Sequence, residues 1–198
     1  MQYSYLALGD SYTIGEQVPA EENFPHQTAA LLSGQIAPPK IIAVTGWTTD
    51  ELDNGINSEK LTSTYDIVSL LIGVNNQYRG RAVSNFKVEF EHLLQRAIQF
   101  AGNKPQHVFV LSIPDWGVTP FAEGHDRKKI MEEIDGYNKV CATAAANFGA
   151  HYIDITSSQR IDGNKDDFLA ADKLHPSGKE YAKWATKLTD GIKKEFGL

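Results

Sequence analysis

Three side chains, one near the beginning of the sequence and two near its end, could together form an activated nucleophile. Ser11 follows Gly9 and Asp10 near the beginning, and Asp172 precedes His175 by three residues near the end. A serine hydroxyl becomes nucleophilic when an imidazole takes its proton and a carboxylate orients that imidazole. We therefore expect Ser11 to be a nucleophile, His175 its general base and Asp172 the carboxylate that fixes the imidazole tautomer.

Acyl transfer through such a serine also needs hydrogen-bond donors for the oxyanion of the tetrahedral intermediate. The candidates are the backbone amides of Ser11 and Gly46 and the side-chain amide of Asn75. Glycine suits position 46, because a side chain there would block the close approach of the backbone to the reacting atoms.

The elements that must position these residues alternate between strand-like apolar runs and helical patterns. The strand-like runs are residues 3–8, 40–44, 66–72, 107–113 and 150–155, and the helical patterns are residues 24–32, 48–56, 82–100, 128–148 and 177–196. This alternation predicts an α/β fold in which a five-stranded parallel sheet is covered by helices on both faces, a three-layer α/β/α sandwich. We expect a polar loop from 157 to 171 and a single domain over residues 1–198, since the sequence contains no linker or internal repeat.

Parallel sheets of this kind hold their sites beyond the carboxyl ends of the strands. Ser11, Gly46 and Asn75 each follow one of the first three predicted strands, so one crevice can collect all three.

Four aromatic residues lie in the same or neighbouring loops. Trp47 is next to Gly46, Tyr78 is just beyond Asn75, and Trp116 and Phe121 follow the fourth predicted strand. We expect them to bind substrate, although they could equally pack the loops onto the scaffold. An apolar wall would favour medium acyl chains, whereas stacking rings would suit a sugar.

Four blocks of the sequence resemble those of the SGNH (GDSL-type) hydrolase family, in family order and across the whole chain: Gly9-Asp10-Ser11, Gly46, Gly73-Val74-Asn75 and Asp172-Lys173-Leu174-His175-Pro176. The resemblance implies a flavodoxin-like fold and hydrolysis of esters, thioesters or lysophospholipids without a cofactor. It also implies an oxyanion hole formed by Ser11, Gly46 and Asn75, and a serine activated by Asp172 and His175.

Two positions depart from the family pattern. Tyr12 stands where leucine is frequent, and Asn76 stands where aspartate is commoner. Asn76 removes a negative charge near the site but leaves Asn75 in place, so we expect an effect on substrate choice rather than on catalysis.

The composition excludes several other classes of protein. The chain has 198 residues, 41% hydrophobic and 22% charged, and a net charge of −6, which disfavours disorder and nucleic-acid binding. Its single cysteine, Cys141, excludes an intrachain disulfide. Residues 162–167 begin like a calcium loop but carry Asp167 and Lys173 where glycine and glutamate are needed, so we expect no metal site.

The leading hypothesis is a serine esterase acting on lipid-like esters, lysophospholipids or thioesters. The alternatives are a carbohydrate O-deacetylase of the same family and a non-catalytic ligand-binding module. We expect a small-molecule ester as partner, no nucleic acid and no stable membrane insertion, while the oligomeric state stays open. The location is cytoplasmic for the sequence as given, and periplasmic or secreted if a leader has been removed.

Overall fold

The computed structural model describes residues 2–61 and 63–198. Its centre is a five-stranded, all-parallel sheet with the order β2-β1-β3-β4-β5. The strands are β1 (Tyr5–Gly9), β2 (Lys40–Ala43), β3 (Ile67–Leu71), β4 (Val108–Leu111) and β5 (His151–Ile153). The three central strands are buried along their whole length, which explains their nearly unbroken apolar sequences, whereas the two edge strands are only partly buried.

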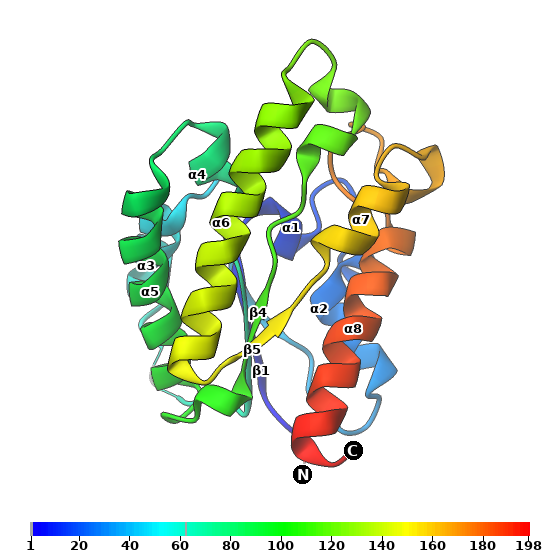
Figure 1. Cartoon of the computed structure of the whole chain (residues 1–198). Helices are drawn as coiled ribbons and strands as arrows, with labels where there is room; N and C mark the ends of the chain where they lie inside the picture. Colours follow the sequence, from blue (N-terminus) through cyan, green and yellow to red (C-terminus); the bar gives the residue numbers. More distant parts are fainter. Residues whose placement is uncertain (1, 62) are drawn as a thin grey trace.

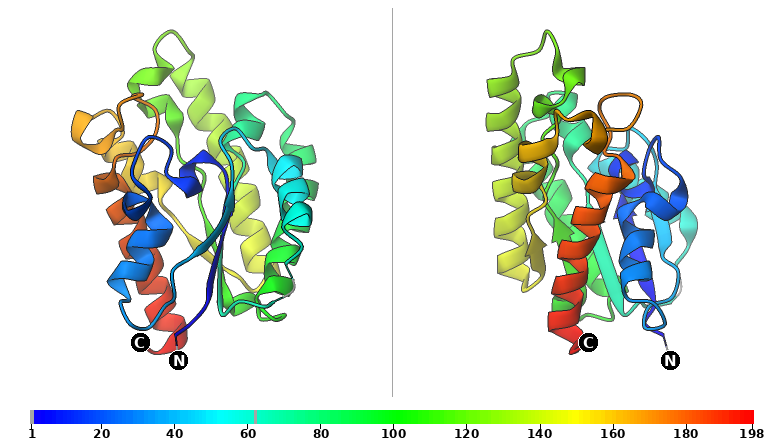
Figure 2. Two further views of the ribbon diagram at one scale, coloured as in Figure 1. Left: turned by 180° about the vertical axis from the view of Figure 1, so that it is seen from behind. Right: turned by 90° about the vertical axis from the view of Figure 1, so that its right-hand side faces the viewer.

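Helices cover both faces of this sheet, as the sequence predicted (Figures 1 and 2). Helices α2 (Phe24–Leu31) and α8 (Gly178–Phe196) pack together on one face. Helices α3 (Thr49–Glu59), α5 (Val83–Phe100) and α6 (Arg127–Phe148) form the layer on the other face. The α/β/α sandwich predicted from the alternation of elements is therefore confirmed.

Short helices occupy the loops at the carboxyl ends of the strands (Figure 1). They are α1 (Ser11–Ile14), α4 (Val74–Tyr78) and α7 (Thr156–Asp162). Single turns of 3₁₀ helix lie at Ala20–Glu22, Pro105–His107, Trp116–Val118, Pro120–Ala122 and Asp166–Phe168.

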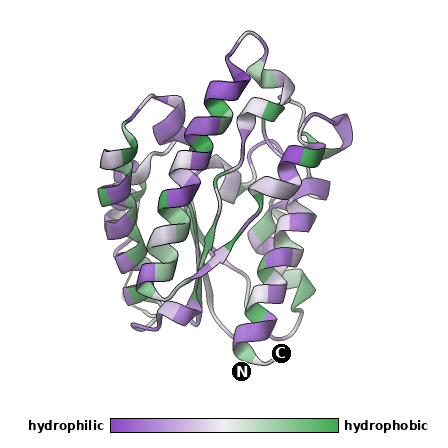
Figure 3. Cartoon of the chain, viewed as in Figure 1, coloured by the Kyte–Doolittle hydropathy of each residue, from purple (hydrophilic) through white to green (hydrophobic). Residues whose placement is uncertain are grey.

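Helix α8 shows why the long helices adopt this arrangement. It buries Tyr181, Trp184, Ala185, Leu188 and Ile192, which recur every three or four residues along one stripe. Figure 3 shows hydrophilic residues on the outward surfaces of the helices and hydrophobic residues toward the sheet. Burying each large apolar side chain stabilises the fold by about 1.5–3 kcal/mol.

One sequence-based expectation was wrong. Residues 157–171 were expected to form a polar loop, but they contain most of α7 and the 3₁₀ turn Asp166–Phe168. Helix α7 buries only the polar residues Thr156 and Gln159, so it has no apolar stripe that a hydrophobic pattern could reveal. Polar contacts hold it instead: the Gln159 side chain, for example, accepts a hydrogen bond of 3.0 Å from the backbone of Asp115.

Within the described residues, none of the helices combines the length and the apolar character that crossing a bilayer requires.

Candidate active site

A tight turn after β1 presents Ser11 at the carboxyl end of the sheet. Gly9 ends β1, and Asp10 caps α1 by accepting a 3.0 Å hydrogen bond from the backbone amide of Tyr12. A Cβ atom at Gly9 would lie only 2.0 Å from the Thr13 hydroxyl oxygen, so no side chain fits at this position. Ser11 is the first residue of α1, where a backbone amide has no acceptor within the helix.

The Asp10 side chain is buried beneath this turn. Burial raises the pKa of Asp10 to about 7, against the opposing effect of the hydrogen bond from Tyr12. Its second carboxyl oxygen, Oδ2, has no hydrogen-bond partner in the described part of the chain. Asp10 therefore forms the turn through one carboxyl oxygen, and its carboxyl group is mostly neutral below a pH of about 7.

The structure brings Ser11, His175 and Asp172 into direct contact. Ser11 Oγ lies 3.0 Å from His175 Nε2, although the two residues are 164 positions apart. His175 Nδ1 lies 2.6 Å from Asp172 Oδ2. Asp172 Oδ1 accepts hydrogen bonds from the backbone amides of Leu174, at 3.0 Å, and His175, at 2.9 Å. Residues 172–175 thus form one local turn, in which the Asp172 carboxylate contacts both the backbone amides and the imidazole ring that follow it.

The electrostatics of this turn keep Asp172 ionised. Partial burial opposes ionisation, but the hydrogen bonds from the His175 ring and from the two backbone amides lower the pKa of Asp172 below its usual value. The Tyr12 ring packs against the imidazole, with ring centroids 5.1 Å apart. A carboxylate that accepts from Nδ1 leaves Nε2 free to accept a proton from Ser11.

The loops that carry Gly46 and Asn75 flank the Ser11 turn. Strands β2 and β3 pair with β1 on either side, and Gly9 is level with Ala43 of β2 and with Leu71 of β3. Because the three strands end at the same level, the residues that follow them gather at one edge of the sheet.

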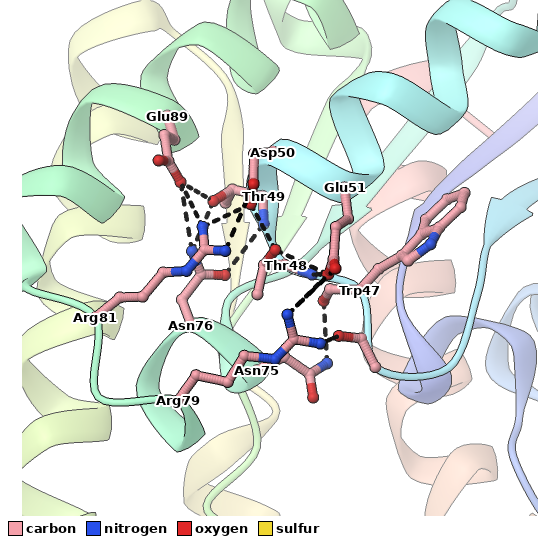
Figure 4. A network of polar contacts seen from close by, with 11 residues as sticks. Trp47, Thr48, Thr49, Asp50, Glu51, Asn75, Asn76, Arg79, Arg81 and Glu89 are labelled. Atoms are coloured by element: carbon pink, nitrogen blue, oxygen red, sulfur yellow. Dashed lines mark hydrogen bonds and ion pairs between the residues drawn. The ribbon is translucent and has the colours of Figure 1, made fainter.

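The backbone at Gly46 and the side chain of Asn75 are tied together (Figure 4). Gly46 has a φ of +84°, a conformation that side chains other than glycine rarely adopt. Asn75 Nδ2 donates to the carbonyl of Trp47 at 3.0 Å, and Arg79 Nη2 donates to the carbonyl of Gly46 at 2.6 Å. The Asn75 amide has a second hydrogen that this contact does not use.

These residues belong to a larger polar network (Figure 4). Arg79 also contacts Glu51, with both oxygens 3.2 Å from Nη1, and Glu51 accepts from the Thr48 backbone amide at 2.8 Å in a capping box for α3. We call the following residues the polar network: Thr48, Thr49, Asp50, Glu51, Asn75, Asn76, Arg79, Arg81 and Glu89.

Asn76 is the buried centre of this network. Its Oδ1 accepts from the Thr49 backbone amide at 3.1 Å, and its Nδ2 donates to the Thr49 hydroxyl at 2.6 Å. The Glu89 carboxylate lies 3.5 Å from Nδ2. An aspartate at position 76 would face this carboxylate as a like charge, which gives a physical reason for asparagine here. Asn76 thus links α4 to α3, and an effect of this position on substrate choice stays a prediction.

Three of the four aromatic residues expected at the substrate line one small apolar pocket. Its volume is about 150 Å³, and the small apolar pocket is lined by Tyr12, Val74, Tyr78, Trp116, Phe121 and Leu174. Three further lining residues were not predicted from the sequence, although each is the immediate neighbour of a predicted site residue: Tyr12, Val74 and Leu174. Their position next to Ser11, Asn75 and His175 in the sequence is the signal that could have identified them.

Trp47 lies outside the lining of this pocket. Its indole covers Gly55 of α3, where a Cβ atom would come within 2.1 Å of the ring. A contact of Trp47 with substrate stays a prediction.

In residues 162–167, the segment that begins like a calcium loop, the first carboxylate forms ion pairs with lysine side chains. Asp162 contacts Lys165 at 2.5 Å and also Lys183. Among the residues that the structure describes, no cluster of three or more His, Cys, Asp or Glu side chains has the arrangement of a metal site.

Comparisons with known proteins agree with this architecture. The sequence profile described as the GDSL-like Lipase/Acylhydrolase family matches residues 7–183. No match was found among curated proteins. Similar solved structures include a lipase/acylhydrolase from Enterococcus faecalis, with 24% identity, a TM-score of 0.72 and coverage of 98% of this chain and 96% of that chain.

Two further structures have different stated activities. A phospholipase A1 from Streptomyces albidoflavus has 20% identity, a TM-score of 0.69 and coverage of 98% of this chain and 100% of that chain. An acetylxylan esterase from Geobacillus stearothermophilus has 16% identity, a TM-score of 0.71 and coverage of 99% and 94%, respectively. At these identities the structures show a shared fold.

Proposed function

The chain belongs to the GDSL-like lipase/acylhydrolase family, and on that premise we propose that it is a serine esterase that forms an acyl-enzyme on Ser11. Family membership supports an ester-hydrolysing enzyme. The observation that carries the finer proposal is the 3.0 Å contact between Ser11 Oγ and His175 Nε2, with Asp172 behind the imidazole.

In the first half of the reaction the serine is acylated. His175 Nε2 takes the Ser11 proton as Oγ attacks the ester carbonyl carbon, and the carbonyl oxygen becomes an oxyanion. When the tetrahedral intermediate collapses, the bond from carbon to the alcohol oxygen breaks, and the imidazolium returns its proton to the departing alcohol. The Asp172 carboxylate stabilises the imidazolium that exists between these two steps.

In the second half, water replaces the alcohol. His175 takes a proton from a water molecule, which attacks the acyl-enzyme and forms a second tetrahedral intermediate. Its collapse breaks the bond between the acyl carbon and Ser11 Oγ, and the serine recovers its proton from the imidazolium. The products are a carboxylic acid and an alcohol.

The oxyanion requires donors at the edge of the sheet where Ser11 lies. The proposed donors are the backbone amides of Ser11 and Gly46 and the unused hydrogen of Asn75 Nδ2. The polar network supports this assignment, because it holds the Gly46 carbonyl and ties the side chain of Asn75 to the carbonyl of Trp47. Donors held before the reaction begins cost no reorganisation in the transition state.

The lining of the small apolar pocket favours a lipid-like acyl group as the first substrate class, with lysophospholipids and thioesters included. Deacetylation of a carbohydrate is the second candidate. The specific observation in its favour is the Tyr78 ring, which lines the pocket and is 53% exposed, so that a sugar could stack on it.

Two measurements test the proposal. A fluorophosphonate probe should label the wild type and not Ser11→Ala, and p-nitrophenyl esters, acetylated sugars and lysophospholipids should show which ester is hydrolysed. Folded protein that neither reacts with the probe nor hydrolyses any of these esters would instead favour a ligand-binding module.

A further inference from the structure

The small apolar pocket shares a wall with a second cavity. The second cavity has a volume of about 490 Å³, and its lining includes Gln77, His125, Ile130 and Glu133. Tyr78 and Trp116 line both spaces. Their rings meet edge to face, with centroids 5.3 Å apart. The two rings therefore separate the space beside Ser11 from a larger one beyond it.

Trp116 is the fixed member of this pair. Its side chain is buried, and the indole Nε1 donates to Gln77 Oε1 at 2.8 Å. Gln77 is itself held, because its Nε2 donates to Glu133 Oε2 at 2.8 Å. The Trp116 ring also packs edge to face on Phe121 and His125, with centroids 6.0 and 5.2 Å away. A ring held by a hydrogen bond and by three aromatic neighbours does not move aside without losing these contacts.

The position of the small apolar pocket indicates which part of an ester it takes. Tyr12, Val74 and Leu174 line it and directly adjoin Ser11, Asn75 and His175 in the chain. An acyl group on Ser11 would have its carbonyl at the oxyanion donors and its alkyl tail in the nearest apolar space. The aromatic residues then meet the tail rather than the alcohol.

The pocket volume limits the length of that tail. One water molecule takes about 30 Å³ of liquid, and a cavity of about 150 Å³ lined by apolar side chains has room for a molecule of the size of benzene. The 150 Å³ of the pocket therefore holds about five carbon atoms beyond the carbonyl.

Resting on the proposed esterase activity, we propose that Trp116, with Tyr78, is the end wall of the acyl pocket and restricts the enzyme to acyl chains of about six carbons or fewer. Removing the indole joins the pocket to the second cavity and lets longer chains enter. The specificity for acyl length then belongs to one side chain and to the hydrogen bond that holds it.

The experiment measures kcat/KM for p-nitrophenyl esters from acetate to laurate. For the wild type we expect the highest value at four to six carbons and at least about a tenfold fall by ten carbons, since each misplaced methylene costs about 10-fold or more. Trp116→Ala should raise the ratio of decanoate to butyrate at least tenfold. Because truncating a buried tryptophan can destabilise the fold, Trp116→Phe and Gln77→Met serve as milder variants, for which we expect intermediate ratios.

Phe121→Ala is the matched control. Phe121 lines the small apolar pocket but not the second cavity, so its removal widens the mouth without opening the shared wall. We expect the ratio of decanoate to butyrate to change less than threefold. A larger change there than in the Trp116 variants would place the limiting wall at Phe121 and overturn the proposal.

The outcomes separate this inference from the proposed function. A wild type that hydrolyses esters and reacts with the fluorophosphonate, but whose preference is unaffected by folded Trp116 variants, overturns the end-wall inference alone. A wild type that hydrolyses laurate as well as butyrate does the same. Absence of both labelling and hydrolysis overturns the proposed function and this inference with it.

Discussion

The two sides of Ser11 are built from different interactions. On one side, the polar network joins the Gly46 loop and Asn75 through hydrogen bonds and ion pairs such as the contacts of Arg79 with Gly46 and Glu51. On the other side, the small apolar pocket is formed by packed rings, and one hydrogen bond, from Trp116 to Gln77, fixes its wall.

The difference matches what each side would have to do in the proposed acyl-transfer reaction. An oxyanion has the same geometry in every ester, and its stabilisation depends on donors that are already in position. Acyl chains differ in length, and apolar contacts discriminate between them only by about 1–3 kcal/mol per methylene. Changes on the polar side should therefore lower turnover of all substrates alike, whereas changes on the apolar side should redistribute activity among them.

The largest effect on kcat is expected for the residues that activate Ser11, because the reaction of every ester depends on them. Asp172→Asn should lower kcat by about 10⁴-fold for every ester, because the amide favours the wrong imidazole tautomer while the geometry is retained. Steady-state kinetics on short and long esters measure this, with circular dichroism as the check on folding. A loss below tenfold, or one confined to some esters, would remove Asp172 from the mechanism.

Asn75→Ala tests the polar side directly. Loss of one oxyanion donor should lower kcat by about 10²–10³-fold, with little change in KM and no change in acyl preference. The ratio of kcat/KM for decanoate to that for butyrate is the decisive measurement. If this ratio shifts as it does in Trp116→Ala, the division between the two sides fails.

Arg79→Ala tests whether the polar network acts through position rather than contact with substrate. Because Arg79 holds the Gly46 carbonyl, we expect kcat to fall uniformly by about tenfold, less than for a donor itself. Arg79→Lys should recover part of this loss, since one donor can still reach Gly46.

The control for Arg79 is a second ion pair on the same elements. Lys40 of β2 contacts Glu59 at the other end of α3 at 2.7 Å, with both side chains exposed to a similar degree as those of Arg79 and Glu51. Lys40→Ala should leave kcat unchanged. An equal loss in both variants would mean that α3 docking in general, and not the Gly46 loop, determines turnover.

Among the variants at the Ser11 end of the sheet, Asp10→Asn should change turnover least, and it instead changes the pH dependence of stability. The folded protein holds the pKa of Asp10 at about 7, above the ordinary value of 3.8, so the folded state binds more protons than the unfolded chain between these pH values. The free energy of unfolding should therefore fall as pH rises from 3.8 to about 7.

Asparagine keeps the acceptor for the Tyr12 amide but does not titrate, so this slope should become shallower in the variant. Urea unfolding at several pH values measures the slope for both proteins. Identical slopes would show that the Asp10 carboxyl is not the group whose protonation favours the folded state.

Much of the fold could be predicted from the sequence, because its signals are local. Continuous apolar runs mark the buried central strands, and recurring apolar residues mark α5 and α8. Helix α7 could not be predicted in this way, because it is held by contacts of Gln159 and Arg160 with Asp115, which is more than 40 positions away.

The same distinction holds at the site. The turn from Asp172 to His175 is local, and the sheet order brings the first three strand ends together, so the candidate residues could be named from the sequence. The side-chain partners could not: nothing in the sequence pairs Trp116 with Gln77, or Asn76 with Thr49. Aromatic residues near a motif are equally able to line a pocket or to pack on the scaffold: Trp116 lines the small apolar pocket, whereas the Trp47 indole covers Gly55.

The two described ends of the chain lie close together beyond the amino ends of the strands, at the opposite end of the sheet from α1 (Figure 1). The rings of Tyr3 and Phe196 are in contact there, with centroids 4.8 Å apart. A tether to a bead or an electrode, attached through either end, would thus orient every molecule with the Ser11 end of the sheet outward. The same proximity suits this chain to insertion as a cassette into a surface loop of a carrier protein.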